Sequence, residues 1–194
     1  MEITSAQIKE LRDQTGISVM QCKKALEEAG GDMEKAVIIL KKKRSEAAEK
    51  KSDREFGAGA IGTYTHNTNE VAAMVQLVCE TDFVAKNDEF VHLAKDIAMH
   101  VAAQAPKYIS REEVSETAMQ KAQEVFQEEI ADKPADMQAK IMEGKLASYF
   151  KEQILLEQPF IKNPDMTIGE MVTGAVQKFG ENISVAAIQR LSVK

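Results

Sequence analysis

Few side chains in this sequence have the spacing that catalysis or metal binding requires. The three histidines, His66, His92 and His100, are far apart and lack the spacing of metal ligands. Cys22 and Cys79 are too few and too isolated for a disulfide scaffold, which favours a reduced, cytoplasmic protein whose thiols are buried. We therefore expect no metal centre, no cofactor and no enzyme built on these residues.

Two segments could be taken for phosphate-binding sites. GAGAIG (Gly57–Gly62) is rich in glycine, but it comes before a predicted strand, not between a strand and a helix, so it predicts a strand that needs small residues. The basic run at Lys41–Arg44 could contact phosphate backbones. However, acidic residues follow, and KKKRSEAAEKKSDRE holds seven basic and four acidic residues, a net of +3. RNA binding by Lys41–Arg54 therefore remains an alternative, not the main prediction.

The segment CETDFVAK (Cys79–Lys86) places carboxylates beside an aromatic residue where the chain is predicted to turn. Nothing near Glu80 or Asp82 in the sequence would raise either pKa for acid–base chemistry. Phe83 precedes Phe90 by seven residues, so both could lie on one buried helix face. Alternatively, Phe83 faces outward, which is unusual for an aromatic side chain unless a partner buries it. The spacing alone leaves both interpretations open.

The composition is that of a globular chain. Apolar residues make up 44% of the 194 residues and charged residues 29%, enough for a core with a charged surface. The net charge of −6 gives no overall attraction to nucleic acid or to an anionic membrane. No apolar run has the length of a membrane span, and the N-terminus does not resemble a signal peptide. We expect no membrane and no direct nucleic-acid partner.

Capping signals divide residues 1–43 into three short helices. Thr4, Ser18 and Asp32 stand where helices should begin, and Gly16 where the first should end. A small three-helix domain needs all of its apolar residues in one core. The expected core residues are Ile8, Leu11, Val19, Cys22, Leu26, Val37, Ile38 and Leu40.

The rest of the chain predicts a solvated linker, partly helical, over residues 44–55 and an α+β core over residues 56–194. The expected elements are two strands around a turn at His66–Asn69, a helix at about Asp88–Gln104, a helical hairpin at about 110–155 opened by Ser110, a helix after TIGE and a final strand in NISVAAIQRLSV. We expect three antiparallel strands with helices on one face. Because a three-stranded sheet has two open edges, pairing with a second copy in a symmetric dimer is plausible.

Several segments in order along the chain resemble the bacterial elongation factor Ts family. ITSAQIKELRDQTGISVMQCKKALEEAGGDMEKAV is similar to the family's N-terminal domain, and TDFVAKNDEF (Thr81–Phe90) to the signature of its core. IAMHVAA, LEQPF and TIGE resemble later segments of the same family. The ordered set covers nearly the whole chain, and it is far more specific than TDFV alone. The resemblance implies a ubiquitin-associated three-helix domain at the N-terminus.

The resemblance also implies a function. Members of this family are guanine-nucleotide exchange factors for elongation factor Tu in translation, and the Mg²⁺ and GDP or GTP belong to that partner. By this resemblance Thr81, Asp82, Phe83 and Val84 reach the partner's nucleotide and Mg²⁺ site. Leu11, Val19 and Met20 would contact its nucleotide domain, and His100 its third domain. The sequence pattern favours a core position for Leu11 over a contact with the partner. For His100 it favours neither a partner contact nor a place on the flank of a helix.

The length departs from that of the longer family members, whose core has two related halves. Here TDFVAKNDEFVHLAKDIAMHVAA passes directly from a first-half motif to a second-half motif, and only one core unit fits. Short members compensate by dimerising, which agrees with a homodimer through the core. A second hypothesis is an adaptor that binds a partner helix through residues 1–43 alone.

Overall fold

The computed structural model describes residues 3–132 and 134–193. It divides into two compact units. The first comprises residues 1–55 and 173–182, and the second residues 56–172 and 183–194. The fold is α+β, as predicted, with helices throughout and one three-stranded antiparallel sheet in the second unit.

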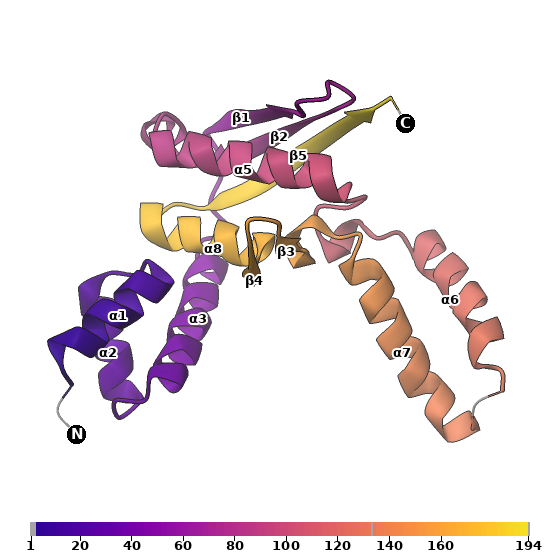
Figure 1. The fold of residues 1–194 in the computed structure, drawn as a ribbon, viewed down its shortest axis with the longest axis horizontal. Coiled ribbons are helices and arrows are strands. Elements are labelled where there is room, and N and C mark those ends of the chain that lie inside the picture. The colour runs from indigo at the N-terminus through magenta and orange to yellow at the C-terminus, as the bar shows by residue number, and fades with distance from the viewer. Residues whose placement is uncertain (1–2, 133, 194) are drawn as a thin grey trace. The chain divides into compact units, whose positions relative to one another are not determined.

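Three helices form most of the first unit: α1 (Ser5–Thr15), α2 (Val19–Glu28) and α3 (Met33–Glu49) (Figure 1). All three predicted caps are confirmed. Thr4 forms a reciprocal capping box with Gln7, and the Ser18 and Asp32 side chains accept hydrogen bonds from the third backbone N–H of their helices. Local hydrogen bonds therefore fix where each helix begins.

The core of the first unit is close to the predicted one, with two errors. Leu11, Cys22, Leu26 and Leu40 are buried, together with Ile17, Ala25 and Ala36, while Ile8 and Val37 are partly buried. Val19 and Ile38 are exposed, so their predicted core positions are wrong. Ile38 lies two residues from both Ala36 and Leu40, about 200° around the helix, and therefore faces away from the core.

The predicted linker is packed against other residues of its unit. Helix α3 continues to Glu49, and the last turns of α8 (Ile168–Phe179) lie beside this segment. Arg44 Nε donates to Gln177 Oε1 at 3.2 Å, and Asn182 Nδ2 donates to the carbonyl of Arg54 at 2.9 Å. The two residues of each hydrogen bond are more than 120 residues apart in sequence, so the composition of this segment alone could not reveal these contacts.

The second unit is built on a sheet with the strand order β1-β2-β5. Strands β1 (Ala58–Thr65) and β2 (Val71–Cys79) form the predicted hairpin, and β5 (Ile183–Ser192) pairs antiparallel with β2. Helix α5 (Asp88–Gln104) has the predicted bounds and lies across one face of the sheet (Figure 1). Its buried residues include Phe90, Ala94, Ile97 and Val101, which recur at helical spacing along one face.

Gly62 allows the helix to lie directly on the sheet. A Cβ built on Gly62 would be only 2.1 Å from the carbonyl oxygen of Ala94 in α5. A Cβ on Gly59 would lie 2.6 Å from the carbonyl oxygen of Leu77 in β2. The glycines of GAGAIG are therefore explained by close backbone packing, as the sequence predicted.

The predicted helical hairpin consists of α6 (Glu116–Ile130) and α7 (Ala135–Lys151), which lie side by side (Figure 1). The prediction that Ser110 opens it is wrong. Ser110 makes no side-chain cap bond and precedes a short 3₁₀ helix, η1 (Arg111–Glu113), whereas Ser115 caps α6 through the N–H of Ala118. Between the two helices, Lys133 lies outside the described residues.

A small region after the hairpin was not predicted. It contains a 3₁₀ helix, η2 (Leu155–Glu157), and a two-stranded sheet of β3 (Pro159–Phe160) and β4 (Asn163–Thr167). Thr167 and Glu170 then form the reciprocal bonds of a capping box at the start of α8, as TIGE predicted. Among the described residues, no helix combines the length and apolar character needed to cross a membrane.

The contact at Gly62 predicts a strong effect of one methyl group. Gly62→Ala should lower the free energy of unfolding by about 3 kcal/mol, because α5 must move off the sheet. Gly144→Ala, in α7, is the matched control, since its Cβ meets nothing within 4 Å. The control should gain about 1 kcal/mol from helix propensity. Urea denaturation followed by circular dichroism measures both, and equal stability of the two variants would contradict the close packing.

Candidate partner-binding site

The TDFV segment forms a separate short helix, α4 (Asp82–Ala85), with Thr81 at its N-cap. The helix is attached to the sheet at its base. Cys79, which is buried, donates from Sγ to the Thr81 carbonyl at 3.2 Å, and α4 packs against β1 and β2. Val84 is half-buried on the inner side, whereas Thr81, Asp82 and Phe83 are exposed. The sheet therefore holds the backbone while the polar and aromatic side chains project outward.

Phe83 faces outward. Its side chain is 85% exposed, while Phe90, seven residues later, is fully buried. The seven-residue spacing does not keep them on one face because the chain forms two helices. Helix α4 ends at Ala85, and Asn87 begins α5 by accepting a hydrogen bond from the N–H of Glu89 at 2.9 Å. The interpretation of Phe83 as a core residue is wrong for this structure.

Asp82 is paired with Lys86, a residue that the sequence analysis did not select. Lys86 Nζ donates to Asp82 Oδ2 at 2.6 Å. This hydrogen bond, with the charge of Lys86, holds the pKa of Asp82 below its usual value. The carboxylate is therefore ionised at neutral pH and is not suited to act as a general acid. The spacing of four residues on one helix was the available signal for this pair.

A backbone contact at Gly57 positions the chain just before α4. The Gly57 N–H donates to the carbonyl of Cys79 at 3.1 Å. A Cβ on Gly57 would lie 2.7 Å from the carbonyl oxygen of Glu80. Because only glycine permits this approach, the first residue of GAGAIG helps to fix the position of Thr81 and the residues after it.

The three candidate residues of the N-terminal domain do not share one environment. Leu11 is fully buried in the core of the first unit. Val19 and Met20 occupy the first turn of α2 and are 55% and 69% exposed. Only Val19 and Met20 are thus available at the surface as an apolar patch.

His100 lies in the interior of the second unit. Its Nδ1 accepts from the N–H of Ile161 at 3.4 Å, so its proton belongs on Nε2, which bonds Gln158 Oε1 at 2.9 Å. Gln158 Nε2 in turn donates to the carbonyl of Glu152 at 2.7 Å. Burial lowers the pKa of His100, although the bond to Gln158 opposes this effect. The ring therefore joins α5 to the end of the hairpin. Gln158 is 58 residues away and was marked in the sequence only as part of LEQPF, not as a partner of His100.

The buried neutral ring predicts a stability loss in acid. The unfolded chain has the ordinary histidine pKa of about 6.5, and the folded pKa is lower. The unfolded state therefore binds the extra proton first as the pH falls below about 6.5, and stability is lost until the folded pKa is reached. Within this window the parent should lose up to about 1.4 kcal/mol per pH unit relative to His100→Gln.

Urea denaturation from pH 8 to pH 5 tests this prediction. The control is a His92→Gln variant, because the His92 side chain is 72% exposed. The control should retain the parent's pH dependence. If parent and His100→Gln lose stability in parallel as the pH falls, His100 is not the responsible group.

The described residues contain no group of three His, Cys, Asp or Glu side chains placed to hold a metal ion. Asp82 has a lysine as its near neighbour and is exposed, which suits contact with a second protein better than metal binding. The site is therefore a surface with an aromatic side chain and an ion pair.

Comparison with known proteins identifies the family. The family described as Elongation factor TS matches residues 24–194. The chain is 47% identical over 194 residues to Elongation factor Ts of Thermodesulfovibrio yellowstonii, covering 100% of this chain and 97% of that protein. It is 46% identical to the protein of the same name from Carboxydothermus hydrogenoformans, with 98% and 89% covered, and 44% identical to that of Fervidobacterium nodosum, with 100% and 99% covered. The full-length similarity and the family match together show that this chain belongs to the elongation factor Ts family.

Proposed function

We propose that this chain is a guanine-nucleotide exchange factor for elongation factor Tu, acting in the cytoplasm during translation elongation. The observation that carries the proposal is the exposure of Phe83 on a short helix anchored to the sheet. Family membership supplies the partner. The chain acts by binding and has no catalytic residue or cofactor of its own, because the nucleotide and Mg²⁺ belong to elongation factor Tu.

Exchange requires that the factor and GDP weaken each other's binding to the same protein. Phe83 can contribute if the pocket that receives it exists only when the partner's Mg²⁺ and phosphate contacts have loosened. Fully burying a phenylalanine is worth roughly 2–3 kcal/mol, about a hundredfold in affinity. Since the side chain is almost fully exposed before binding, nearly all of that free energy is available.

The neighbouring residues have supporting roles in this proposal. Thr81 and Asp82 approach the nucleotide and Mg²⁺ site of the partner with Phe83, and Val84 anchors the helix to the sheet. Val19 and Met20, which are exposed, contact the partner's nucleotide domain. Leu11 and His100 were also implied as contacts, but both are buried, so either would reach a partner only after its surroundings open.

We further propose a homodimer through the core sheet. The face of the sheet opposite α5 carries Ile61, Met74 and Leu191, all exposed and on neighbouring strands. Apolar side chains gathered on one open sheet face indicate a surface that another protein covers. A second copy is the occupant we propose, because one core unit resembles only half of the longer family members' core.

Two alternatives have less support. An adaptor that uses residues 1–43 alone would leave Phe83 without a role. An RNA-binding protein that uses Lys41–Arg54 would need free basic side chains, but Arg44 is bound to Gln177, and Lys42 and Lys43 lie beside Glu46 and Glu28. RNA binding that is strong, salt-dependent and lost on neutralising these lysines would favour the second alternative.

The release of fluorescent GDP from elongation factor Tu tests the main proposal. Phe83→Ala should slow factor-stimulated release by about tenfold to a hundredfold, the range set by the burial of one phenylalanine. Phe56→Ala is the matched control, since Phe56 is also exposed but lies outside the TDFV segment. Thermal melting verifies that both variants fold.

A parent protein that does not accelerate release would refute the proposed function. If the parent is active and Phe83→Ala is equally active, the exchange function stands, but the role of Phe83 is wrong. If Phe56→Ala is as impaired as Phe83→Ala, the effect is not specific to the TDFV segment.

The dimer has its own test. Ile61→Glu places a charge on the exposed sheet face, so it should weaken self-association at least tenfold in sedimentation equilibrium, because a carboxylate is costly to bury unpaired. Thr63→Glu would not serve as a control, because Thr63 lies on the same exposed sheet face as Ile61. Glu124→Gln, on α6, is the control, and it should associate like the parent. A parent that remains monomeric at all concentrations would contradict the dimer.

A further inference from the structure

The short helix α4 is too short to be stable by its own hydrogen bonds. It has four residues, Asp82–Ala85, and therefore a single turn. Isolated helices shorter than about 12 residues are marginal in water, because closing the first turn orders several residues for one hydrogen bond. The Thr81 side chain makes no cap bond to α4, although α1, α2, α3, α5 and α6 all begin with one. Groups outside α4 must therefore keep its turn closed.

The turn of α4 closes on one carbonyl group. The Ala85 N–H donates to the Thr81 carbonyl at 3.2 Å. The Cys79 thiol donates to the same carbonyl, also at 3.2 Å. The oxygen that completes the helical turn is thus held by a side chain of the sheet.

Cys79 is a firm base for this hydrogen bond. It is the last residue of β2, the central strand, and it pairs with Ala58 of β1 on one side and with Ile183 of β5 on the other. Its side chain is fully buried. Because the thiol is shielded from water, its hydrogen bond is stronger than the same bond would be at the surface. The order of the central strand therefore extends to Thr81.

We propose that Cys79 is a positioning residue for nucleotide exchange, a role that rests on the exchange function proposed above. Its thiol holds the Thr81 carbonyl, which keeps the turn of α4 closed and so directs the Phe83 side chain toward the partner. Only molecules in which this turn is formed are competent to bind, and the apparent affinity falls with that fraction. Cys79 acts through α4, because its own side chain is buried.

Two substitutions at Cys79 separate the hydrogen bond from the space that the thiol fills. Cys79→Ala removes the donor, whereas Cys79→Ser retains an O–H donor at nearly the same place. Val75→Ala is the matched control for stability, because Val75 is also buried and lies on the same face of β2, four residues earlier. A valine side chain has no hydrogen-bond donor to lose. Urea denaturation measures how far each variant is destabilised.

Hydrogen exchange of the Ala85 amide, followed by NMR on the full chain, measures whether the turn of α4 is held. Losing one hydrogen bond of ordinary strength should speed the exchange of this amide about fivefold in Cys79→Ala. In Cys79→Ser and Val75→Ala the rate should stay within about twofold of the parent's.

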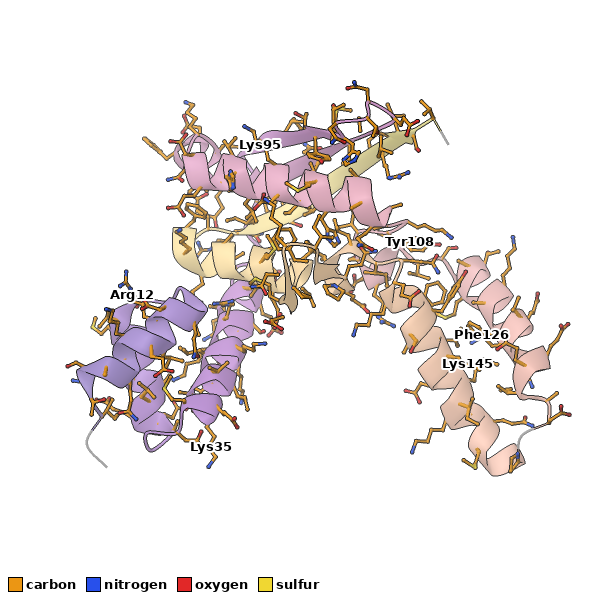
Figure 2. All side chains as sticks on the ribbon, in the orientation of Figure 1. Arg12, Lys35, Lys95, Tyr108, Phe126 and Lys145 are labelled. Carbon is orange, nitrogen blue, oxygen red and sulfur yellow. The ribbon has the colours of Figure 1, made fainter. Side chains whose placement is uncertain are left out.

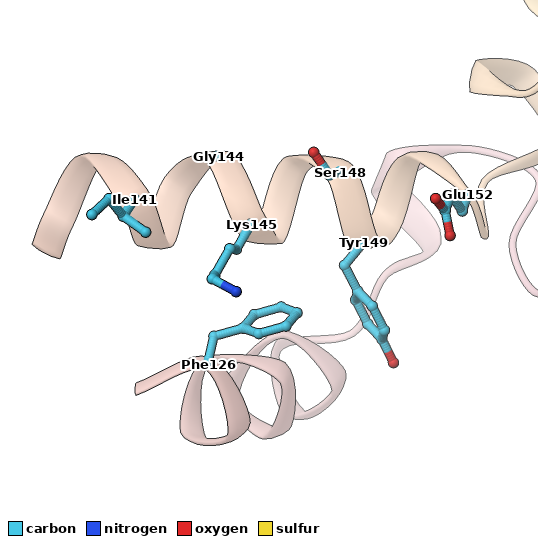
Figure 3. A pocket seen from close by; sticks show the side chains of 7 residues that line it. All are labelled: Phe126, Ile141, Gly144, Lys145, Ser148, Tyr149 and Glu152. Carbon is cyan, nitrogen blue, oxygen red and sulfur yellow. The ribbon is translucent and has the colours of Figure 1, made fainter. Parts of the chain in front are cut away.

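The amides of the helical hairpin serve as the internal control. Helices α6 and α7 are joined by contacts of their own. Lys145 Nζ of α7 lies 5.3 Å from the centroid of the Phe126 ring of α6 (Figures 2 and 3). Tyr149 packs edge to face against the same ring, with centroids 5.6 Å apart (Figure 3). The exchange of these amides should be the same in Cys79→Ala as in the parent, which would show that the effect at Ala85 is local.

The release of fluorescent GDP from elongation factor Tu measures the consequence for function. Cys79→Ala should slow factor-stimulated release at least twofold and at most about fivefold, since the competent fraction cannot fall by more than the opening of α4 rises. In the Phe83→Ala background the same substitution should change release by less than about 1.5-fold, because the side chain that it positions is absent.

Equal exchange rates of the Ala85 amide in the parent and in Cys79→Ala would overturn the proposal. So would a Cys79→Ser variant as impaired as Cys79→Ala, because the donor would then be irrelevant. An equal loss of release activity in Val75→Ala would indicate general stability, and effects of Cys79→Ala and Phe83→Ala that multiply would indicate independent roles. A parent that does not accelerate release would refute the exchange function itself, and the Ala85 amide would still decide whether the thiol holds α4.

Discussion

The close approach of α5 to the sheet at Gly62 is the contact on which the second unit depends. The helix backbone lies so near β1 that a single Cβ would meet the Ala94 carbonyl oxygen at 2.1 Å. With the helix in this position, its buried face covers one side of β1 and β2, and the other side of the sheet stays open. This contact sets how closely the helix packs on β1.

The two ends of α5 connect the sheet to different functional regions. At the N-terminal end, the Asn87 cap separates α5 from α4, so Phe83 can project into solvent while Phe90 is buried. Near the C-terminal end, His100 binds Gln158, which also holds the last residues of the hairpin through the Glu152 carbonyl. A second link at the hairpin base is the paired contact of Arg111 with Glu157 at 2.9 and 2.7 Å. One rigid helix thus supports both the TDFV segment and the base of the hairpin.

The proposed binding surface at α4 follows one physical principle. An exposed apolar side chain can contribute binding free energy only if it stays exposed in the free protein, and its backbone must therefore be held elsewhere. At α4 the sheet and Cys79 hold the backbone, leaving Phe83 free. The cost of ordering this segment is met during folding, before a partner arrives.

The sequence by itself determined where α1, α2 and α3 begin, the β1–β2 hairpin, the bounds of α5 and the α+β class. These features depend on hydrogen bonds between residues three or four apart, on glycine and on alternating or helical apolar spacing. The sequence also selected the TDFV segment, but only through its resemblance to a family. Only the tertiary structure decided that Phe83 is exposed, that His100 is buried and that Arg44 is bound to Gln177. These outcomes depend on which distant segments meet, at separations of 58 residues for His100 and Gln158 and 133 for Arg44 and Gln177, and no local pattern encodes such contacts.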